Sequence, residues 1–305
     1  MNSNFSPSAP GMLAILFALV MWTGLVAYYA FFPNLTPTAI VAYRIVWSFV
    51  LVCILISCLR QWHVIREIAR NKKNLILLTL CGIFLGLNWL AFVVAIKVGK
   101  AMEASLGSYL NPMLGVASAV FVFREHVSFL KKASMCIAFI GVGYLIIAHG
   151  TVPWYALALS IPFMFYAIVH KYLTLNVLNG FFFEMLILMP FAVSYLLLSP
   201  DIVLFIDESV KMQIMIIMLG PISCLSLIAF AYGIQKLSFS TVNVIQYLYP
   251  TMTFILSITY FNEPIGNRMI PFIFIWLGVL IYLIDTLMHA RQKKQNSVTV
   301  LRRSL

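Results

Sequence analysis

The feature that most limits the fold of this chain is a succession of apolar stretches, each about 20 residues long, joined by short connections. A stretch of that length crosses a bilayer as a helix, because a helix satisfies its own backbone hydrogen bonds and lipid cannot. The composition agrees, with 63% hydrophobic and 10% charged residues. The sequence therefore predicts an all-α integral membrane protein without a separate soluble domain. We expect ten spans, at roughly 11–32, 39–59, 74–96, 103–123, 133–149, 153–170, 180–199, 213–234, 240–261 and 270–290.

An internal repeat relates the two halves of the chain. Residues 88–146 reappear in diluted form 138 positions later, and the matched pairs include Phe92 with Phe230, Tyr109 with Tyr247, Pro112 with Pro250, Glu125 with Glu263, and Tyr144 with Tyr282. Proline and glutamate matches in one register are hard to explain by chance in so apolar a chain. We expect two five-helix repeats at 11–149 and 153–290, and a basic tail at 291–305. A repeat with five spans ends on the face opposite its start, so the second copy inserts upside down.

Such an inverted pair favours a transporter, because two halves of nearly equal energy can rock about a central site. The competing class is a membrane scaffold or receptor that transports nothing. The sequence has no GxxxxGK[ST] phosphate loop, no HExxH and no GxSxG, and its histidines and cysteines lack metal-ligand spacing. We therefore expect neither an ATP-driven pump nor an enzyme, and we expect no catalytic residues, metal or cofactor.

The basic residues predict the orientation in the membrane. The even-numbered connections and the tail hold most of the lysines and arginines, while the odd-numbered connections hold only Lys97, Lys100, Lys211 and Arg268. The positive-inside rule therefore places both termini in the cytoplasm. The net charge of +11 follows from this orientation and from contact with anionic lipid headgroups, so it does not indicate binding to nucleic acid.

Two charges fall well inside predicted spans, Arg44 in the second and Glu184 in the seventh. A charge at that depth is costly and needs a partner. The seventh span is the repeat counterpart of the second, so the two residues either pair with each other or have separate roles. Coupling to protons through Glu184 or Glu103 also stays open at this point.

Polar and aromatic residues gather in mirrored clusters in the fourth and ninth spans, near Pro112 and Pro250. Each proline removes a backbone donor and predicts a helix kink at mid-depth. Helical spacing puts Ser105 and Tyr109 on one face. Taken singly, each polar residue also fits helix–helix bonding, but the mirrored clusters predict a cavity for a small amphipathic solute. The expected lining is Trp22, Asn88, Trp89, Ser105, Tyr109, Asn111, Tyr166, Asn243, Gln246 and Tyr247.

Several runs resemble the chloramphenicol-sensitivity RarD branch of the EamA-type drug/metabolite transporters. They are residues 44–48, 60–62 and 88–89, the run 103–107 leading to Asn111 and Pro112, Glu184 with Pro190, residues 246–247 with Pro250, and residues 274–276 with Asp285. The resemblance implies ten helices in two inverted EamA repeats in the bacterial cytoplasmic membrane.

The same resemblance implies a permease for small metabolites or drugs. We expect a secondary exporter, with an importer of amino acids or of a nucleotide-like metabolite as the alternative, working as a monomer or homodimer in the lipid bilayer. One departure from the family pattern concerns the turns after the fourth and ninth spans. Arg124 stands where relatives usually carry glycine before Glu125, and Asn262 precedes Glu263 in the second repeat.

Overall fold

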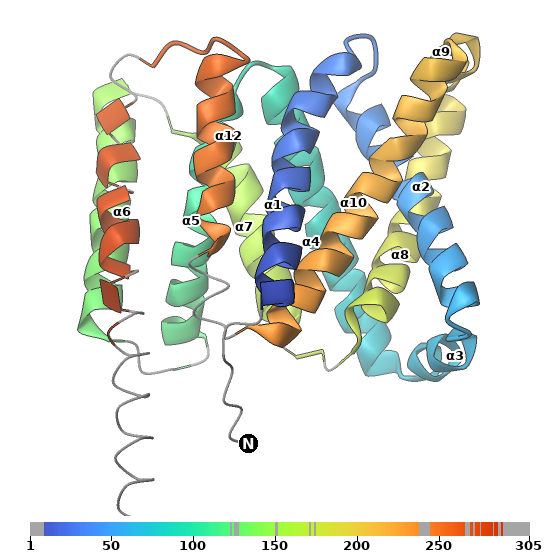
Figure 1. Cartoon of the computed structure of the whole chain (residues 1–305), viewed down its shortest axis with the longest axis horizontal. Coiled ribbons are helices and arrows are strands. Elements are labelled where there is room, and N and C mark those ends of the chain that lie inside the picture. Colours follow the sequence, from blue (N-terminus) through green and yellow to red (C-terminus); the bar gives the residue numbers. More distant parts are fainter. Residues whose placement is uncertain are drawn as a thin grey trace, which may run out of the picture. The chain divides into compact units, whose positions relative to one another are not determined.

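The computed structural model of the 305-residue chain describes positions 9–122, 124, 128–149, 152–170, 172–173, 175–237, 245–265, 269–270, 272–274, 276–282, 284–285 and 288. Within these positions every regular element is a helix, so the all-α prediction is confirmed (Figure 1). The residues form two compact units, the first made of 1–111 and 154–263 and the second of 112–153 and 264–305. The predicted basic tail and Asn243 lie outside the described residues.

Most of the long helices belong to the first unit. They are α1 (Ala9–Tyr28) with the 3-10 helix η1 (Tyr29–Phe31), α2 (Pro37–Cys58), α4 (Lys72–Lys97), α7 (Trp154–His170), α8 (Val177–Leu198), α10 (Val210–Lys236) and α12 (Leu248–Thr259). Helix α5 (Ala101–Phe121) begins in this unit, and α6 (Phe129–His149) belongs to the second.

Local sequence signals set where these helices begin. Thr36, Asn71, Asn176 and Ser209 precede α2, α4, α8 and α10, and each side-chain oxygen accepts a hydrogen bond from a backbone N–H of the first turn. Such caps satisfy donors that the helix itself leaves free. Pro37 follows Thr36 at the first helical position, where its missing N–H costs nothing.

Five helices among the described residues are long and apolar enough to cross a membrane, namely α1 with η1, α2, α4, α8 and α10. The chain is therefore a multi-pass membrane protein. Helices α5, α6, α7 and α12 fall in further expected ranges, and the described positions from 269 to 288 are helical. The count of ten spans stays a prediction, since α7 and α12 have only 17 and 12 residues.

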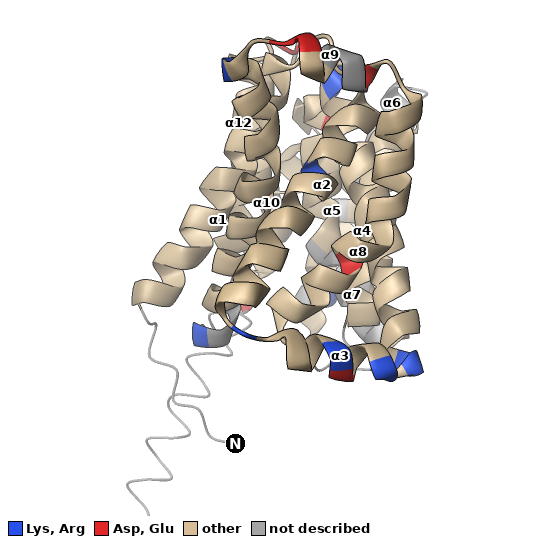
Figure 2. Cartoon of the chain, turned by 90° about the vertical axis from the view of Figure 1, so that its right-hand side faces the viewer, with Lys and Arg blue, Asp and Glu red and all other residues tan. Residues whose placement is uncertain are grey.

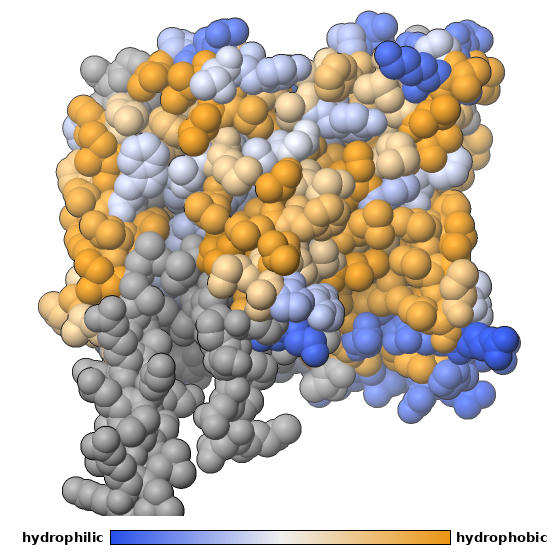
Figure 3. All heavy atoms as spheres, viewed as in Figure 1, coloured by the Kyte–Doolittle hydropathy of each residue, from blue (hydrophilic) through white to orange (hydrophobic). Residues whose placement is uncertain are grey.

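The surface of the first unit separates into apolar and polar zones. Figure 3 shows hydrophilic atoms near α9 (Asp201–Asp207) and near α3 (Trp62–Arg70), with a hydrophobic zone between them. Figure 2 shows that charged residues gather at these same helix ends. This zoning is the one that a bilayer imposes on the exposed faces of helices.

Helices α3 and α9 lie in ranges that are expected from the sequence to be connections only. Helix α3 is amphipathic: Ile65 and Ile68 are buried, while Arg66 and Glu67 on the other side are exposed. The sequence contains this alternation of apolar and charged residues. Nine residues are too few for a span, however, and the charges are typical of a loop. The helix packs against α4.

Close helix packing in the first unit depends on glycine. A Cβ at Gly220 of α10 would overlap backbone atoms of Trp47 and Ser48 in α2, and the Ser48 hydroxyl donates to the Gly220 carbonyl at 3.2 Å. A Cβ at Gly107 of α5 would lie 2.7 Å from the Ala156 carbonyl oxygen of α7. Small residues let membrane helices approach in this way where lipid offers no hydrophobic drive.

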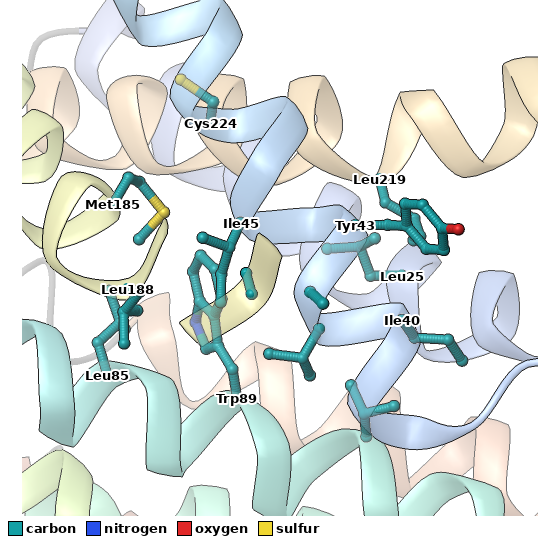
Figure 4. Close-up of a cluster of buried hydrophobic side chains, with 14 of the residues drawn as sticks. Leu25, Ile40, Tyr43, Ile45, Leu85, Trp89, Met185, Leu188, Leu219 and Cys224 are labelled. Carbon is teal, nitrogen blue, oxygen red and sulfur yellow. The ribbon is translucent and has the colours of Figure 1, made fainter. Parts of the chain in front are cut away.

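The largest buried cluster of the first unit joins α2, α4, α8 and α10. In Figure 4, Trp89 extends from α4 beside Ile45 of α2, with Leu85 and Leu188 next to it. Helices α1 and α10 lie side by side, as do α4 and α7, and α2 packs on both α8 and α10. This arrangement encloses the two intramembrane charges.

The two turns that lack the family's glycine still adopt the backbone conformation that glycine favours. Arg124 and Asn262 both have φ of 52°, in the left-handed region. Asparagine enters this region at modest cost, and arginine does so less often. The departure from the family pattern therefore does not remove the turn geometry.

Candidate functional site

Arg44 lies within α2 and is 6% exposed. Its Nε donates to the Ser223 hydroxyl of α10 at 2.6 Å, and Nη1 donates to the Tyr29 hydroxyl at 3.1 Å. The guanidinium carbon lies 3.5 Å from the centre of the Trp89 ring in α4, a cation–π contact. Hydrogen bonds and the ring thus replace part of the hydration that burial removes. We call these four residues the Arg44 centre.

A row of aromatic rings continues from this centre. The Tyr29 ring lies 6.5 Å from Phe92, and Phe92 lies 6.5 Å from Tyr249 of α12. Trp22 of α1, expected to line a cavity, lies 5.9 Å from Tyr249 and 5.0 Å from Phe230 of α10. The rings therefore join α1, α4, α10 and α12 around one charged group, and two of the expected lining residues, both tryptophans, lie here.

Glu184 is enclosed in α8 with 1% exposure. Neither carboxylate oxygen has a hydrogen-bond partner within the part of the chain that the structure describes. The Nε2 atom of His170, at the end of α7, lies 3.5 Å from Oε1. The His170 ring is 5.1 Å from that of Tyr166, another expected lining residue. We call these three residues the Glu184 centre.

The two charges that the sequence left open to pair with each other have separate partners. Over the described positions, the structure has no ion pair between Arg44 and Glu184. Arg44 bonds to α10 and to η1, whereas Glu184 faces α4 and α7. A Cβ at Gly82 of α4 would lie 3.2 Å from the Glu184 carbonyl oxygen, so α4 and α8 are close at this point.

Two expected lining residues bond α5 to α12. The Ser105 hydroxyl donates to the Pro250 carbonyl at 2.8 Å, and the hydroxyls of Tyr109 and Thr251 are 2.5 Å apart. Ser105 and Tyr109 are both fully buried. Their shared helix face, predicted from spacing, is therefore the face that contacts α12.

The turn after α12 returns to the start of α5. Glu263 accepts hydrogen bonds from the backbone N–H groups of Ala101 at 2.6 Å and Met102 at 3.0 Å. A carboxylate is favourable there, since the N-terminus of a helix has free donors and a positive dipole end. The repeat singled out Glu263 in the sequence, but its capping role depends on the tertiary contact.

The remaining expected site residues are dispersed. The Asn88 amide donates to the Leu159 carbonyl of α7 at 2.8 Å, which is a helix–helix bond. Asn111 is half-buried with an unpartnered Oδ1 among the described residues, Gln246 is half-buried, and Tyr247 is buried just before α12. Neither Asn243 nor the side chain of Pro112 is described.

The expected kinks at the two prolines differ in their backbone context. Helix α5 continues through Pro112, whereas Pro250 is the third residue of α12. A turn at Tyr247 separates the helical residues Ile245 and Gln246 from α12. The helix is thus interrupted within one turn of Pro250, and the kinks themselves stay predictions.

Asp201 forms a polar group that the sequence analysis missed. Its carboxylate accepts from the Thr36 N–H at 3.3 Å, the Thr36 hydroxyl at 3.1 Å and the Tyr195 hydroxyl at 2.9 Å, and the residue is 1% exposed. The Tyr43 hydroxyl donates to the Asp201 carbonyl. This network connects α9 to the start of α2. The helix cap at Thr36 is the one feature of the local sequence that indicates a polar group here.

A cavity of about 290 Å³ lies where α3, α4 and the start of α8 meet. Its lining is Val64, Glu67, Ile68, Asn71, Asn74, Leu175, Asn176 and Asn179. None of these residues belongs to the expected cavity lining, so this space is separate from both charged centres. Among the described residues, no group of three or more His, Cys, Asp and Glu has a geometry that could hold a metal.

Comparison with known proteins gives a consistent assignment. Residues 9–147 match the model of the EamA-like transporter family. Over 94% of this chain and 97% of the relative, the sequence is 30% identical to the uncharacterized transporter YojE of Bacillus subtilis. It is 28% identical to Protein RarD of Salmonella typhi, over 93% of this chain and 97% of the relative. A third relative, the chloramphenicol-sensitive protein RarD of Pseudomonas aeruginosa, is 26% identical over 90% and 93% of the two chains.

The fold is also similar to a solved crystal structure, with a TM-score of 0.61 and 19% sequence identity. The match covers 92% of this chain and 99% of the other. At that identity the likeness concerns the fold alone.

Proposed function

The chain belongs to the RarD branch of the EamA-like transporter family, and from that membership we propose that it is a secondary carrier that exports small amphipathic solutes by alternating access. Its family and its apolar helices make it a membrane transporter. The proposal adds the mechanism, the direction and the class of solute. The proton is the coupling ion that we propose.

The observation that carries the mechanism is the repeated arrangement of helices in the first unit. Shifting α3 and α4 by the repeat offset of 138 gives 200–208 and 210–235, which nearly coincide with α9 (Asp201–Asp207) and α10 (Val210–Lys236). The end of α5, shifted likewise, is position 259, where α12 ends. The left-handed residues Arg124 and Asn262 are also 138 positions apart. These agreements support two five-helix repeats at 11–149 and 153–290.

The helix contacts follow the same offset, which relates α1 to α7, α2 to α8 and α4 to α10. The contact of α1 with α10 then corresponds to that of α7 with α4, and the contact of α2 with α10 corresponds to that of α8 with α4. All four contacts are present. Gly82 and Gly220 are also repeat partners, and each lies against the backbone of a helix in the other half. A pseudo-two-fold relation of this kind supports an inverted pair, whose halves can exchange shapes between the two faces of the membrane.

The contact between α5 and α12 supplies candidate gate residues. Ser105 and Tyr109 on α5 meet Pro250 and Thr251 on α12 through hydroxyl hydrogen bonds that separate without leaving charges in lipid. Each helix carries a proline at matched positions, where a missing hydrogen bond eases bending. We propose that these helices part to admit solute, with Gln246, Tyr247 and Asn243 lining the opening.

The side chains around this contact favour an uncharged, partly aromatic solute. Trp22 and Tyr249 offer aromatic rings, and the nearby hydroxyls offer hydrogen bonds. The printed name of a relative, chloramphenicol-sensitive protein, points to a solute of this type. Chloramphenicol and aromatic amino acids are therefore the first probes, and an amino-acid or nucleotide-like importer is the alternative.

Reconstituted liposomes provide the test. We expect the purified protein to accelerate movement of at least one compound from a panel of labelled chloramphenicol, amino acids and nucleosides, relative to empty vesicles. Tyr109→Ala should slow this flux while the protein still inserts, with Tyr28→Phe as a control that changes a hydroxyl outside the proposed gate. Absence of flux and of ligand-induced thermal stabilisation across the panel would favour a scaffold or receptor instead. Efflux from loaded cells separates export from import.

The proposed orientation, with both termini cytoplasmic, has its own test. A cysteine introduced at position 297 of a cysteine-free variant should react with an impermeant maleimide only after the cells are permeabilised. Labelling of intact cells would reverse the orientation.

A further inference from the structure

We infer that Glu184 and His170 together form the proton-binding pair of this carrier, with Glu184 as the buried acceptor and His170 as its connection to water. The inference rests on the proposed transport function and names the residues that would couple it to a proton gradient. It starts from a contrast between two buried carboxylates.

Asp201 and Glu184 are equally buried, at 1% exposure, but differ in their hydrogen bonds. Asp201 accepts three, two from Thr36 and one from Tyr195, which suit an ionised carboxylate. Glu184 accepts none of that geometry from the residues that the structure describes, and the Tyr166 hydroxyl is its one weaker donor. An ionised carboxylate left in that state is expensive, and a bound proton or an adjacent cation removes most of the cost.

The surroundings of Glu184 suit a proton better than a larger cation. Helix α4 approaches so closely that a Cβ at Gly82 would already crowd the Glu184 backbone. The carboxylate oxygens are enclosed, and a proton binds to such an oxygen without the space that a hydrated metal ion or an organic ammonium group requires.

His170 supplies the exchange with water. Its side chain is 31% exposed, and its Nε2 lies 3.5 Å from Glu184 Oε1, within a few tenths of an ångström of hydrogen-bond range. Histidine is the side chain that ordinarily exchanges protons near neutral pH. In the transfer step the Nε2–H bond of the imidazolium breaks and an O–H bond forms on Glu184. The products are neutral imidazole and a carboxylic acid, and a hydronium ion restores the imidazolium.

The other titratable groups around Glu184 do not provide a fixed counter-charge. Cys81 of α4 interacts electrostatically with Glu184, and Tyr166 of α7 does so and also donates its hydroxyl weakly to the carboxylate, but both groups are neutral in their protonated forms. Among the described residues of α2, α9 and α10, Arg44 bonds to Ser223 and Tyr29, Tyr43 bonds to Asp201, and Cys224 is a buried thiol. The charge of the pair therefore follows its own proton occupancy.

This placement couples protonation to helix packing. Glu184 and His170 belong to the second repeat, whereas Cys81 and Gly82 of α4 belong to the first, so the pair lies where the two halves touch. Loss of the proton puts a net negative charge into that contact. The closed contact is then favoured only with the proton bound, which makes protonation shift the population of the two arrangements.

The first test reads the proton directly. Infrared difference spectra of the full-length protein in liposomes, recorded across a pH series, should contain a carboxylic-acid carbonyl band that Glu184→Gln removes. Glu103→Gln is the control, because Glu103 is partly exposed and lies 3.4 Å from Lys100 in an ion pair. His170→Gln should slow the appearance of the band after a pH jump, since it removes the side chain that connects Glu184 to water. A band that Glu184→Gln leaves unchanged would overturn the assignment.

The second test reads coupling. With a gradient of one pH unit, one proton per neutral solute supports accumulation of about tenfold. Wild-type liposomes should approach that ratio for the transported panel compound, while Glu184→Gln equilibrates the compound without accumulating it. Full accumulation by Glu184→Gln would refute the coupling even if transport itself is confirmed. If the wild type moves nothing in the panel, the transport proposal fails, and the infrared band alone still decides whether Glu184 holds a proton.

Discussion

The Arg44 and Glu184 centres each enclose one charge, on helices that the proposed repeat relates. Arg44 is surrounded by groups oriented toward its charge: two hydroxyls and the face of Trp89. Glu184 is more deeply buried, yet among the described residues its oxygens have only a weak donor in Tyr166 and a neighbour, His170, that can lose its charge. Arg44, whose charge is permanent, has fixed partners, whereas Glu184, whose charge can be neutralised by a proton, does not.

This difference indicates which of the two centres holds the helices together. Polar networks whose hydrogen bonds are all formed make a core rigid. A buried polar group without hydrogen bonds lowers stability, and such groups often have a functional role. The Arg44 centre connects α2, α4 and α10 through fixed contacts. The Glu184 centre lies between α4, α7 and α8, where a change of charge alters the contact.

The largest expected effect concerns the glycines beside the two centres. Gly220→Ala should destabilise the protein by about 3 kcal/mol, because the new methyl meets α2 backbone that cannot move aside. Gly82→Ala should cost about 1 kcal/mol, since its closest contact with α8 is 3.2 Å. Thermal unfolding in detergent measures both, with Gly24→Ala as the control in open space. Equal costs at the two positions would remove the proposed difference in rigidity.

Arg44→Met should lower stability by about 2 kcal/mol. The substitution leaves the hydroxyls of Tyr29 and Ser223 without their cationic partner and removes the contact with Trp89, while relief of the buried charge offsets part of the loss. Thermal unfolding of the purified variant gives the value, and Arg44→Lys tests geometry against charge. An Arg44→Met protein as stable as wild type would mean that this centre is not structural.

Glu184→Met should act with the opposite sign and raise the free energy of unfolding by about 1 kcal/mol, because an apolar side chain replaces a carboxylate without hydrogen bonds. The same residue is thus introduced at both centres, so their melting temperatures compare directly. Destabilisation as large as that of Arg44→Met would indicate that Glu184 is bonded structurally and would break the comparison.

The smallest effect is expected at the contact between α5 and α12. Tyr109→Phe removes the hydroxyl hydrogen bond to Thr251 and should cost about 0.5–1 kcal/mol while keeping the buried ring. If this contact is a gate, Tyr109→Phe should change flux more than it changes stability. Thr251→Val, which removes the other hydroxyl, should have the same effects as Tyr109→Phe. Loss of stability with unchanged flux would make the contact ordinary packing.

The sequence by itself determined where the long apolar helices α1, α2, α4, α8 and α10 lie, because hydropathy is a local property of the chain, but it did not indicate α3 and α9. It also determined the repeat offset, and with it the correspondence of Glu125 with Glu263 and of Pro112 with Pro250. Arg44, Trp89, Tyr109 and Glu184 were all identifiable as exceptional residues, since charge and hydrogen-bonding groups are costly within an apolar stretch.

Only the tertiary structure decided which partners those residues have. Arg44 bonds to Ser223, 179 positions away, and Asp201 bonds to Thr36, 165 positions away, and no periodicity specifies a contact at such separations. Side chains from different helices meet according to how closely the backbones approach, and Gly82 and Gly220 set that approach. The sequence therefore placed two charges in apolar stretches, and the packing gave Arg44 two hydrogen bonds and an aromatic face, and gave Glu184 neighbours that can themselves titrate.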